Sequence, residues 1–118
     1  LIGCGFMGNM HANCYNNIPD AKVVAVADLR REKAEEVAKI SDAQIYVTGK
    51  ELIEKADVDI IDICLPTYLH AEHALLAMDK VKYLFVEKPV TLTIRSGYFS
   101  GCFCASSILS RFTVLSCN

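Results

Sequence analysis

The stretch Leu1-Ile2-Gly3-Cys4-Gly5-Phe6-Met7-Gly8 decides the fold prediction for this chain of 118 residues. Its three glycines have the spacing GxGxxG, directly after an apolar strand end and directly before a helical pattern. In that context the first glycine permits a tight turn, the second lets the backbone approach a phosphate group, and the third allows close helix packing. The helix N-terminus adds free N–H groups and a positive dipole end. We therefore predict a phosphate-binding turn with contacts from Gly3, Gly5, Phe6, Met7 and Gly8, the alternative being a turn without a ligand.

Short β-branched apolar runs alternate with longer helical patterns from residue 1 to residue 93. This alternation is typical of βαβ units that form a parallel sheet. We predict strands at residues 1–2, 23–27, 45–47, 60–65 and 83–86, and helices at residues 8–17, 31–40, 50–56 and 67–80. In the second helix the apolar stripe is Ala34, Val37, Ala38 and Ile40. Glu35 and Lys39 have the spacing of an i,i+4 ion pair on its wet side. The fold prediction is a doubly wound α/β domain with a parallel sheet.

Both ends of the chain depart from a complete domain of this kind. Leu1 lies only two residues before Gly3, whereas a parallel strand usually spans about five or six residues, so we expect an incomplete first strand. Residues 94–118 contain no Asp or Glu, six Ser and three Cys, and no sustained helical or alternating period. We expect no element there that completes the sheet. A frame-shifted, wrongly spliced or disordered end explains this change in composition better than a divergent terminus does.

Composition excludes several classes of function. The net charge is −2, and no stretch gathers Lys and Arg into a face that would follow a phosphate backbone, so no nucleic acid partner is expected. No apolar run approaches the roughly 20 residues of a membrane helix, and no signal peptide opens the chain, so we expect no membrane partner and a cytoplasmic location. Cys4, Cys14 and Cys64 lie within core patterns and are interpreted as reduced. The cysteine and histidine spacings predict no metal site.

An acidic residue closes the second predicted strand. Asp28 follows Gly8 by 20 residues, where a carboxylate can accept hydrogen bonds from the hydroxyls of an adenosine ribose. This placement favours a dinucleotide over other ligands of a glycine turn. A ribose 2′-phosphate would meet like charge from Asp28, so NAD is favoured over NADP, which stays possible. Arg30 and Arg31 leave two interpretations open: a guanidinium that contacts adenine or a 2′-phosphate, or a solvated first helical turn.

Two further motifs follow predicted strands at the carboxyl edge of the sheet, where ligands of open α/β folds bind. After the fourth strand, Pro66 stops the strand, Thr67 can cap the next helix, and His70 falls in that helix's first turn. A lone histidine there is more often structural than functional. After the fifth strand come Glu87, Lys88 and Pro89, and Pro89 can adopt a cis bond. Lys88 could stabilise a developing alkoxide, hold a substrate hydroxyl or bind cofactor, or be a plain surface lysine.

With the glycine turn, Asp28, Pro66-Thr67-Tyr68-Leu69-His70 and Glu87-Lys88-Pro89 in this order, the chain resembles the N-terminal NAD(P)-binding domain of the glucose-fructose oxidoreductase, inositol dehydrogenase and MocA family. The resemblance covers residues 1–93 and includes Gly8-Asn9-Met10-His11-Ala12 and the block from Ala71 to Pro89. Val81 departs from the pattern, because family members usually carry a glycine there in a left-handed turn. We therefore expect local strain at Val81.

The resemblance implies NAD(P)-dependent oxidation of a hydroxyl on a sugar, cyclitol or related small molecule. Lys88 would match the family's catalytic or substrate-orienting lysine. The cofactor contacts would be Gly3, Gly5, Gly8 and Asp28, and the nicotinamide side would be lined by Leu65, Pro66, Thr67, His70 and Glu87. The family's C-terminal α/β domain supplies the substrate sheet and an Asp and His pair for proton transfer, and nothing after residue 93 resembles it. Family members commonly associate through that domain, so the parent protein is expected to be a homo-oligomer.

Three hypotheses for function follow. The first is an oxidoreductase whose cofactor half is residues 1–93, inactive without its substrate half. The second is a dinucleotide-binding module without catalysis, or an inert fragment. The third is a methyltransferase, which also uses a glycine turn followed by an acidic residue but gives no reason for Glu87-Lys88-Pro89. We favour the first hypothesis for the parent protein.

Overall fold

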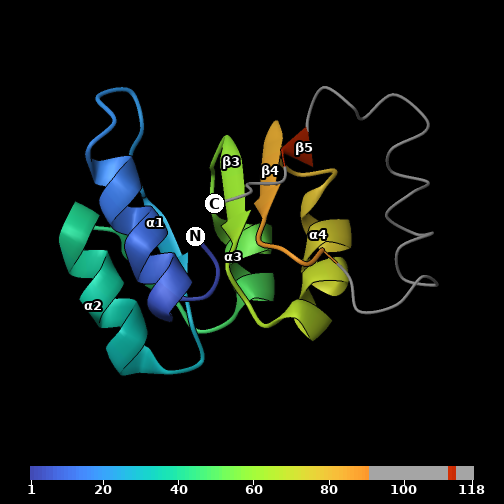
Figure 1. The fold of residues 1–118 in the computed structure, drawn as a ribbon, viewed down its shortest axis with the longest axis horizontal. Helices are drawn as coiled ribbons and strands as arrows, with labels where there is room; N and C mark the ends of the chain where they lie inside the picture. Colours follow the sequence, from blue (N-terminus) through green and yellow to red (C-terminus); the bar gives the residue numbers. More distant parts are fainter. Residues whose placement is uncertain (91–111, 114–118) are drawn as a thin grey trace. The chain divides into compact units, whose positions relative to one another are not determined.

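Parallel strands and helices make up the structure, a computed structural model that describes residues 1–90 and 112–113 (Figure 1). The chain divides into two units, Leu1–Val58 and Asp59–Asn118, and each is described by itself. The predicted boundary at residue 93 and the tail residues 94–111 and 114–118 lie outside the described residues. Every strand pairing in the described part is parallel, which confirms the α/β class predicted from the sequence.

The first unit has two paired strands and three helices. Its elements are α1 (Phe6–Asn16), β1 (Ala25–Ala27), α2 (Arg31–Ser41), β2 (Gln44–Tyr46) and α3 (Gly49–Lys55). β1 pairs with β2 in the register Ala25↔Gln44 and Ala27↔Tyr46. The predicted first strand at residues 1–2 appears as a single bridge between Ile2 and Ala27, extended by backbone hydrogen bonds to residues 25 and 27. The chain before the glycine turn therefore lies beside β1.

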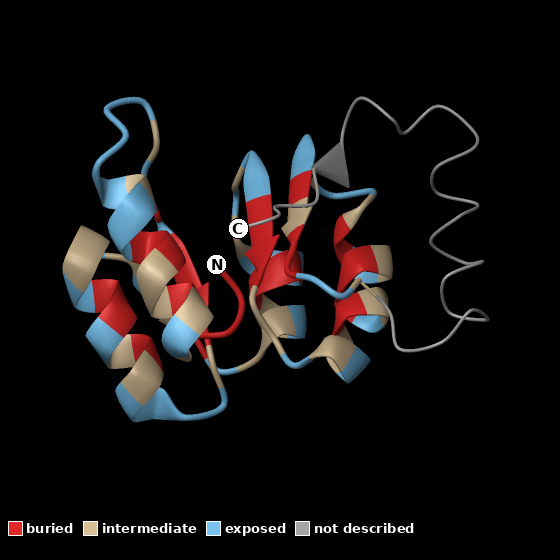
Figure 2. Ribbon diagram, viewed as in Figure 1, coloured by how far each residue is buried: buried red, intermediate tan, exposed pale blue. Residues whose placement is uncertain are grey.

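Small and β-branched residues form the core of this unit. All three residues of β1 are buried, and because successive side chains alternate between faces, both faces of the strand are covered. α2 buries Ala34, Val37 and Ala38 against the strands, as the predicted stripe requires, whereas Ile40 is only half-buried. α1 and α2 lie side by side in Figure 1, and Figure 2 shows exposed residues along both helices.

The second unit is a parallel β-α-β arrangement. It comprises β3 (Ile60–Ile63), the 3-10 helix η1 (Thr67–Leu69), α4 (His70–Ala77), β4 (Tyr83–Val86) and β5 (Phe112–Thr113). β3 pairs with β4 from Ile60↔Tyr83 to Ile63↔Val86, and α4 packs against both strands (Figure 1). β5 pairs with β4, so the expectation of no strand beyond residue 93 is wrong. Ile61, Ile63, Leu84 and Val86 are buried and form the core of this unit.

Several local predictions are corrected by the structure. Thr67 begins η1 and makes no capping bond, and α4 starts at His70 without a side-chain cap, so the predicted helix 67–80 is two shorter elements. Val81 is not in the left-handed region; among the described non-glycine residues only Asp42, at the end of α2, has a positive φ, of 55°. Glu35 pairs with Arg31 at 2.8 Å instead of Lys39. No helix in the described part is long and apolar enough to span a membrane.

Candidate functional site

The glycine turn links the first extended residues to α1. Gly3 has a φ of 94°, a conformation that residues with a Cβ rarely adopt, and its N–H donates to the Ala27 carbonyl at 2.8 Å. Gly5 is the N-cap of α1, and Gly8 is buried within the helix's first turn. The three glycines thus have the predicted positions: Gly3 in the turn, Gly5 at the helix N-cap and Gly8 buried in the helix.

The N-terminus of α1 has the properties of an anion site. Gly5 makes no side-chain cap, and the first turn carries no acidic residue. A Cβ built at Gly5 would meet only a guanidinium nitrogen of Arg30 within 4 Å, at 3.9 Å, so the space above the turn is open. Backbone N–H groups and the helix dipole favour negative charge at such a position. The turn therefore fits the pyrophosphate of a dinucleotide.

Asp28 lies just beyond the end of β1 and is tied to the glycine turn. One carboxylate oxygen accepts the Cys4 N–H at 2.8 Å, and the other accepts the Arg30 N–H at 2.8 Å. The Arg30 Nε lies 3.7 Å from the same carboxylate. The Asp28 side chain is 11% exposed and that of Arg30 is 66% exposed. A carboxylate has about four acceptor positions, so Asp28 can hold the turn and still accept bonds from ribose hydroxyls.

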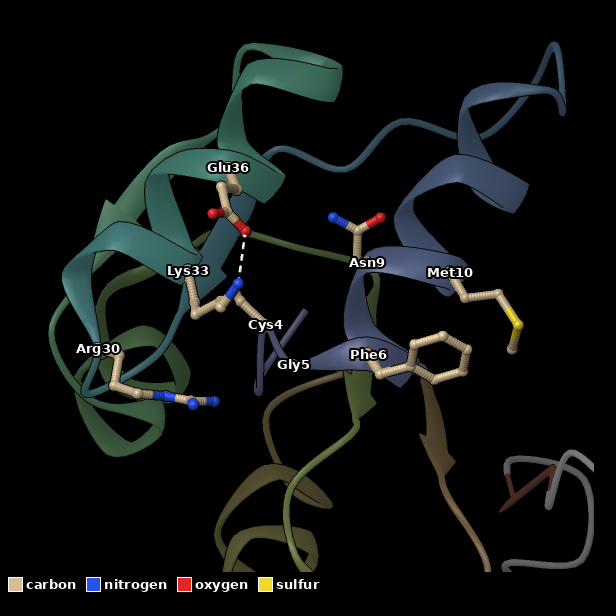
Figure 3. A pocket seen from close by; sticks show the side chains of 8 residues that line it. All are labelled: Cys4, Gly5, Phe6, Asn9, Met10, Arg30, Lys33 and Glu36. Carbon is tan, nitrogen blue, oxygen red and sulfur yellow. Dashed lines mark hydrogen bonds and ion pairs between the residues drawn. The ribbon is translucent and has the colours of Figure 1, made fainter.

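A cavity of about 470 Å³ opens beside the turn, between α1 and α2. Figure 3 shows Arg30 and Lys33 extending toward the turn from the side of α2, while Phe6 and Met10 point to the opposite side. Gly5, Phe6 and Arg30 were expected at a cofactor site and line this cavity. Sequence reasoning did not name the other five lining residues as cofactor contacts, namely Cys4, Asn9, Met10, Lys33 and Glu36. Helical spacing from Phe6 and Arg30 by three or four positions could have found Met10 and Lys33.

Cys4 also lines this cavity, but burial protects its thiol from reaction. Its thiol is 1% exposed and donates to the Ala27 carbonyl at 3.7 Å. Burial, with a smaller contribution from the Asp28 charge, raises the pKa of the Cys4 thiol to about 11. Cys4, Cys14 and Cys64 are free thiols. Cys4 therefore acts as a small apolar residue beneath the turn.

In the second unit, the predicted residues gather where β3 and β4 end. Glu87 is buried, and its N–H continues the ladder by donating to the Ile63 carbonyl at 3.0 Å. Lys88 is exposed, and the Lys88–Pro89 bond is cis, as the sequence allowed. The Cys64 thiol contacts a carboxylate oxygen of the buried Asp62 at 3.5 Å, and burial followed by the Asp62 charge raises the pKa of that thiol. This edge therefore holds buried acidic groups behind an exposed lysine.

His70 joins the two segments that leave this edge. Its ring is 1% exposed, with Nδ1 2.9 Å from the Pro89 carbonyl oxygen and Nε2 2.5 Å from that of Leu65. The ring therefore brings the segment after β3 together with the segment that carries Lys88. Pro66 is exposed and Thr67 half-buried in the intervening turn. With both ring nitrogens on carbonyls, the geometry favours a positioning role for His70 over direct contact with a ligand.

Comparisons with known proteins identify the family of this chain. Residues 1–98 match the model of an oxidoreductase family with an NAD-binding Rossmann fold. The inositol 2-dehydrogenase of Rubrobacter xylanophilus is 37% identical over 91 residues, which are 76% of this chain and 26% of that protein. The myo-inositol 2-dehydrogenase of Thermotoga maritima is 33% identical over 95 residues, 80% of this chain and 28% of that protein.

Solved structures give the same result. The myo-inositol dehydrogenase of Lactobacillus casei, in complex with NAD(H) and myo-inositol, is 28% identical with a TM-score of 0.82. The likeness covers 96% of this chain and 34% of that one, so the chain spans about a quarter to a third of the length of these relatives. The resemblance inferred from the motifs is confirmed. This chain belongs to the oxidoreductase family with an NAD-binding Rossmann fold.

Proposed function

We propose that this chain is the cofactor-binding part of an NAD(P)-dependent oxidoreductase that acts on a hydroxyl of a cyclitol, a sugar or a related small molecule. The observation that carries the proposal is the assembly of an uncapped α1 N-terminus, an open Gly5 and the Asp28 carboxylate bound to the backbone of the turn. The relatives named as inositol dehydrogenases support the substrate class.

In this proposal the residues of the first unit hold the ADP-ribose part of the cofactor. The turn from Gly3 to Gly8, including the backbone of Phe6 and Met7, binds the pyrophosphate, and Asp28 accepts hydrogen bonds from the ribose hydroxyls. A guanidinium nitrogen of Arg30 lies 3.9 Å from the position of a Cβ at Gly5, and we expect this side chain to contact the adenosine end. The exposed Phe6 ring lines the cavity beside the turn.

The second unit provides the residues expected around the nicotinamide, namely Leu65, Pro66, Thr67, His70 and Glu87. When bound, NAD supplies a hydride acceptor. Lys88, exposed at the end of β4, orients the substrate oxygen and stabilises negative charge on it. His70 fixes the backbone on both sides of this edge through Leu65 and Pro89. A general base for the hydroxyl proton would come from the remainder of the parent protein, which we expect to be a homo-oligomer.

The test is a titration of the full chain with NADH, followed by nicotinamide fluorescence, for wild type and Gly5→Ala. The added methyl group lies 3.9 Å from its nearest neighbour beyond the adjoining residues, and a φ of −74° suits any residue, so we expect an unchanged melting temperature. The same methyl group occupies the path of the pyrophosphate, so we expect NADH affinity to fall by about tenfold or more.

Asp20→Ala, in an exposed loop of the same unit, serves as the control and should bind NADH like wild type. Saturable binding that Gly5→Ala abolishes supports the proposal. A folded wild-type chain that binds no NADH, or a Gly5→Ala variant that binds it equally well, would contradict the proposal.

A further inference from the structure

On the α2 side of the cavity, the positive charge of a lysine is neutralised by a neighbouring glutamate. Lys33 and Glu36 both line the cavity, and their side chains form an ion pair at 2.9 Å across one turn of the helix (Figure 3). Arg30, the other cation of the lining, lies 3.7 Å from the Asp28 carboxylate. Each cation of this wall is therefore matched by a carboxylate of its own unit.

This balance matters for the choice between the two nicotinamide dinucleotides. The phosphate that distinguishes NADP from NAD is attached to the adenosine ribose and carries a charge of about −1.5 to −2 at neutral pH. Its binding depends on cations that can turn toward it, because like charges repel it. Lys33 lines the cavity and carries the charge for such a contact, but its ammonium group is paired with the Glu36 carboxylate at 2.9 Å.

We propose that Glu36 is a specificity-determining residue of the cofactor site: by pairing with Lys33 it keeps the cavity beside the glycine turn unfavourable to a 2′-phosphate, so that NAD is preferred over NADP. This inference rests on the proposed function. Glu36, a carboxylate within α2, thus acts in addition to Asp28, and the sequence pattern did not indicate it.

Asp28 and Glu36 differ in how readily they can be changed. Both oxygens of Asp28 accept backbone N–H groups that shape the turn, so altering Asp28 alters the site itself. Glu36 is 53% exposed, and its side chain pairs with Lys33. A Glu36→Gln substitution therefore removes the charge and keeps the side-chain shape, without disturbing the turn.

The experiment titrates the full chain with NADH and NADPH and compares the ratio of the two dissociation constants. For Glu36→Gln we expect NADPH to bind about three- to tenfold more tightly, with NADH changed by less than about twofold, because contacts of a partly exposed cation with a phosphate are of this size. Adding Lys33→Met to Glu36→Gln should cancel the gain. Raising the salt concentration should reduce it.

Asp59→Asn is the matched control. It removes the same charge and breaks an exposed pair of the same length, with Lys82 at 2.9 Å, but neither of these residues lines the cavity. It should leave both affinities unchanged. An equal NADPH gain in Asp59→Asn, a gain that survives Lys33→Met, or an unchanged ratio in Glu36→Gln alongside normal NADH binding would overturn this inference alone. Loss of NADH binding in wild type as well as in every variant would overturn the proposed function and this inference with it.

Discussion

Replacing Asp28 by alanine should destabilise the first unit even without a cofactor. The carboxylate accepts the N–H groups of Cys4 and Arg30, both at 2.8 Å, and so connects the glycine turn to the end of β1. Cys4 is 1% exposed, so its N–H would lose its acceptor in a place that water hardly reaches.

The expected size of this loss follows from the two bonds. A hydrogen bond to a charged group contributes about 1.5–3 kcal/mol, and the bond to Cys4 is partly buried. The bond to Arg30 is exposed and adds only about 0.5 kcal/mol. We therefore expect Asp28→Ala to lower the free energy of unfolding by about 2–3 kcal/mol. Asp28→Asn keeps the shape and one oxygen acceptor and should cost about half as much.

The measurement is urea unfolding of the full chain followed by far-UV circular dichroism at pH 7, with linear extrapolation to water. Amide hydrogen exchange of Cys4, measured by NMR, locates the effect and should become faster in Asp28→Ala. Asp20→Ala should unfold like wild type. A stability within about 0.5 kcal/mol of wild type for Asp28→Ala, or unchanged exchange at Cys4, would refute the anchoring function of the carboxylate.

Four further results are expected. Thr48 accepts the Glu51 N–H at 3.1 Å as the N-cap of α3, so Thr48→Ala should cost about 1 kcal/mol in urea unfolding and Thr48→Ser should restore most of it. Asp42 ends α2 with a φ of 55°, so Asp42→Gly should raise the melting temperature, and a drop would contradict the strain assigned to it. At pH 8 iodoacetamide should modify the exposed Cys14 well before Cys4, as followed by peptide mass spectrometry. Because the Cys4 pKa is raised from about 9 to about 11 on folding, its contribution to stability is present below pH 9 and is lost as the pH rises toward 11, and a flat urea midpoint from pH 8 to 11 would contradict this.

Local periodicity was enough to predict most elements. Tyr83–Val86 has the predicted bounds, and α2 departs from its prediction by one residue, because each has a strong apolar pattern of its own kind. Predictions that depended on a single position failed more often. Thr67 does not cap a helix because residues 67–69 form a 3-10 turn before α4, and Val81 is not left-handed. Backbone conformation at one residue depends on the contacts around it, which a single sequence does not contain.

The sequence by itself determined the family, the parallel α/β fold and the order of the glycine turn, Asp28 and the Glu87-Lys88-Pro89 segment, because spacing along the chain is enough to specify them. Only the tertiary structure showed that Asp28 holds the turn by two backbone bonds, that both nitrogens of His70 contact carbonyls of separate segments, and that Glu36 neutralises Lys33 in the cavity. These contacts depend on side-chain rotamers and on the packing of neighbouring elements, so their partners are decided when the chain is folded and not by residue type alone.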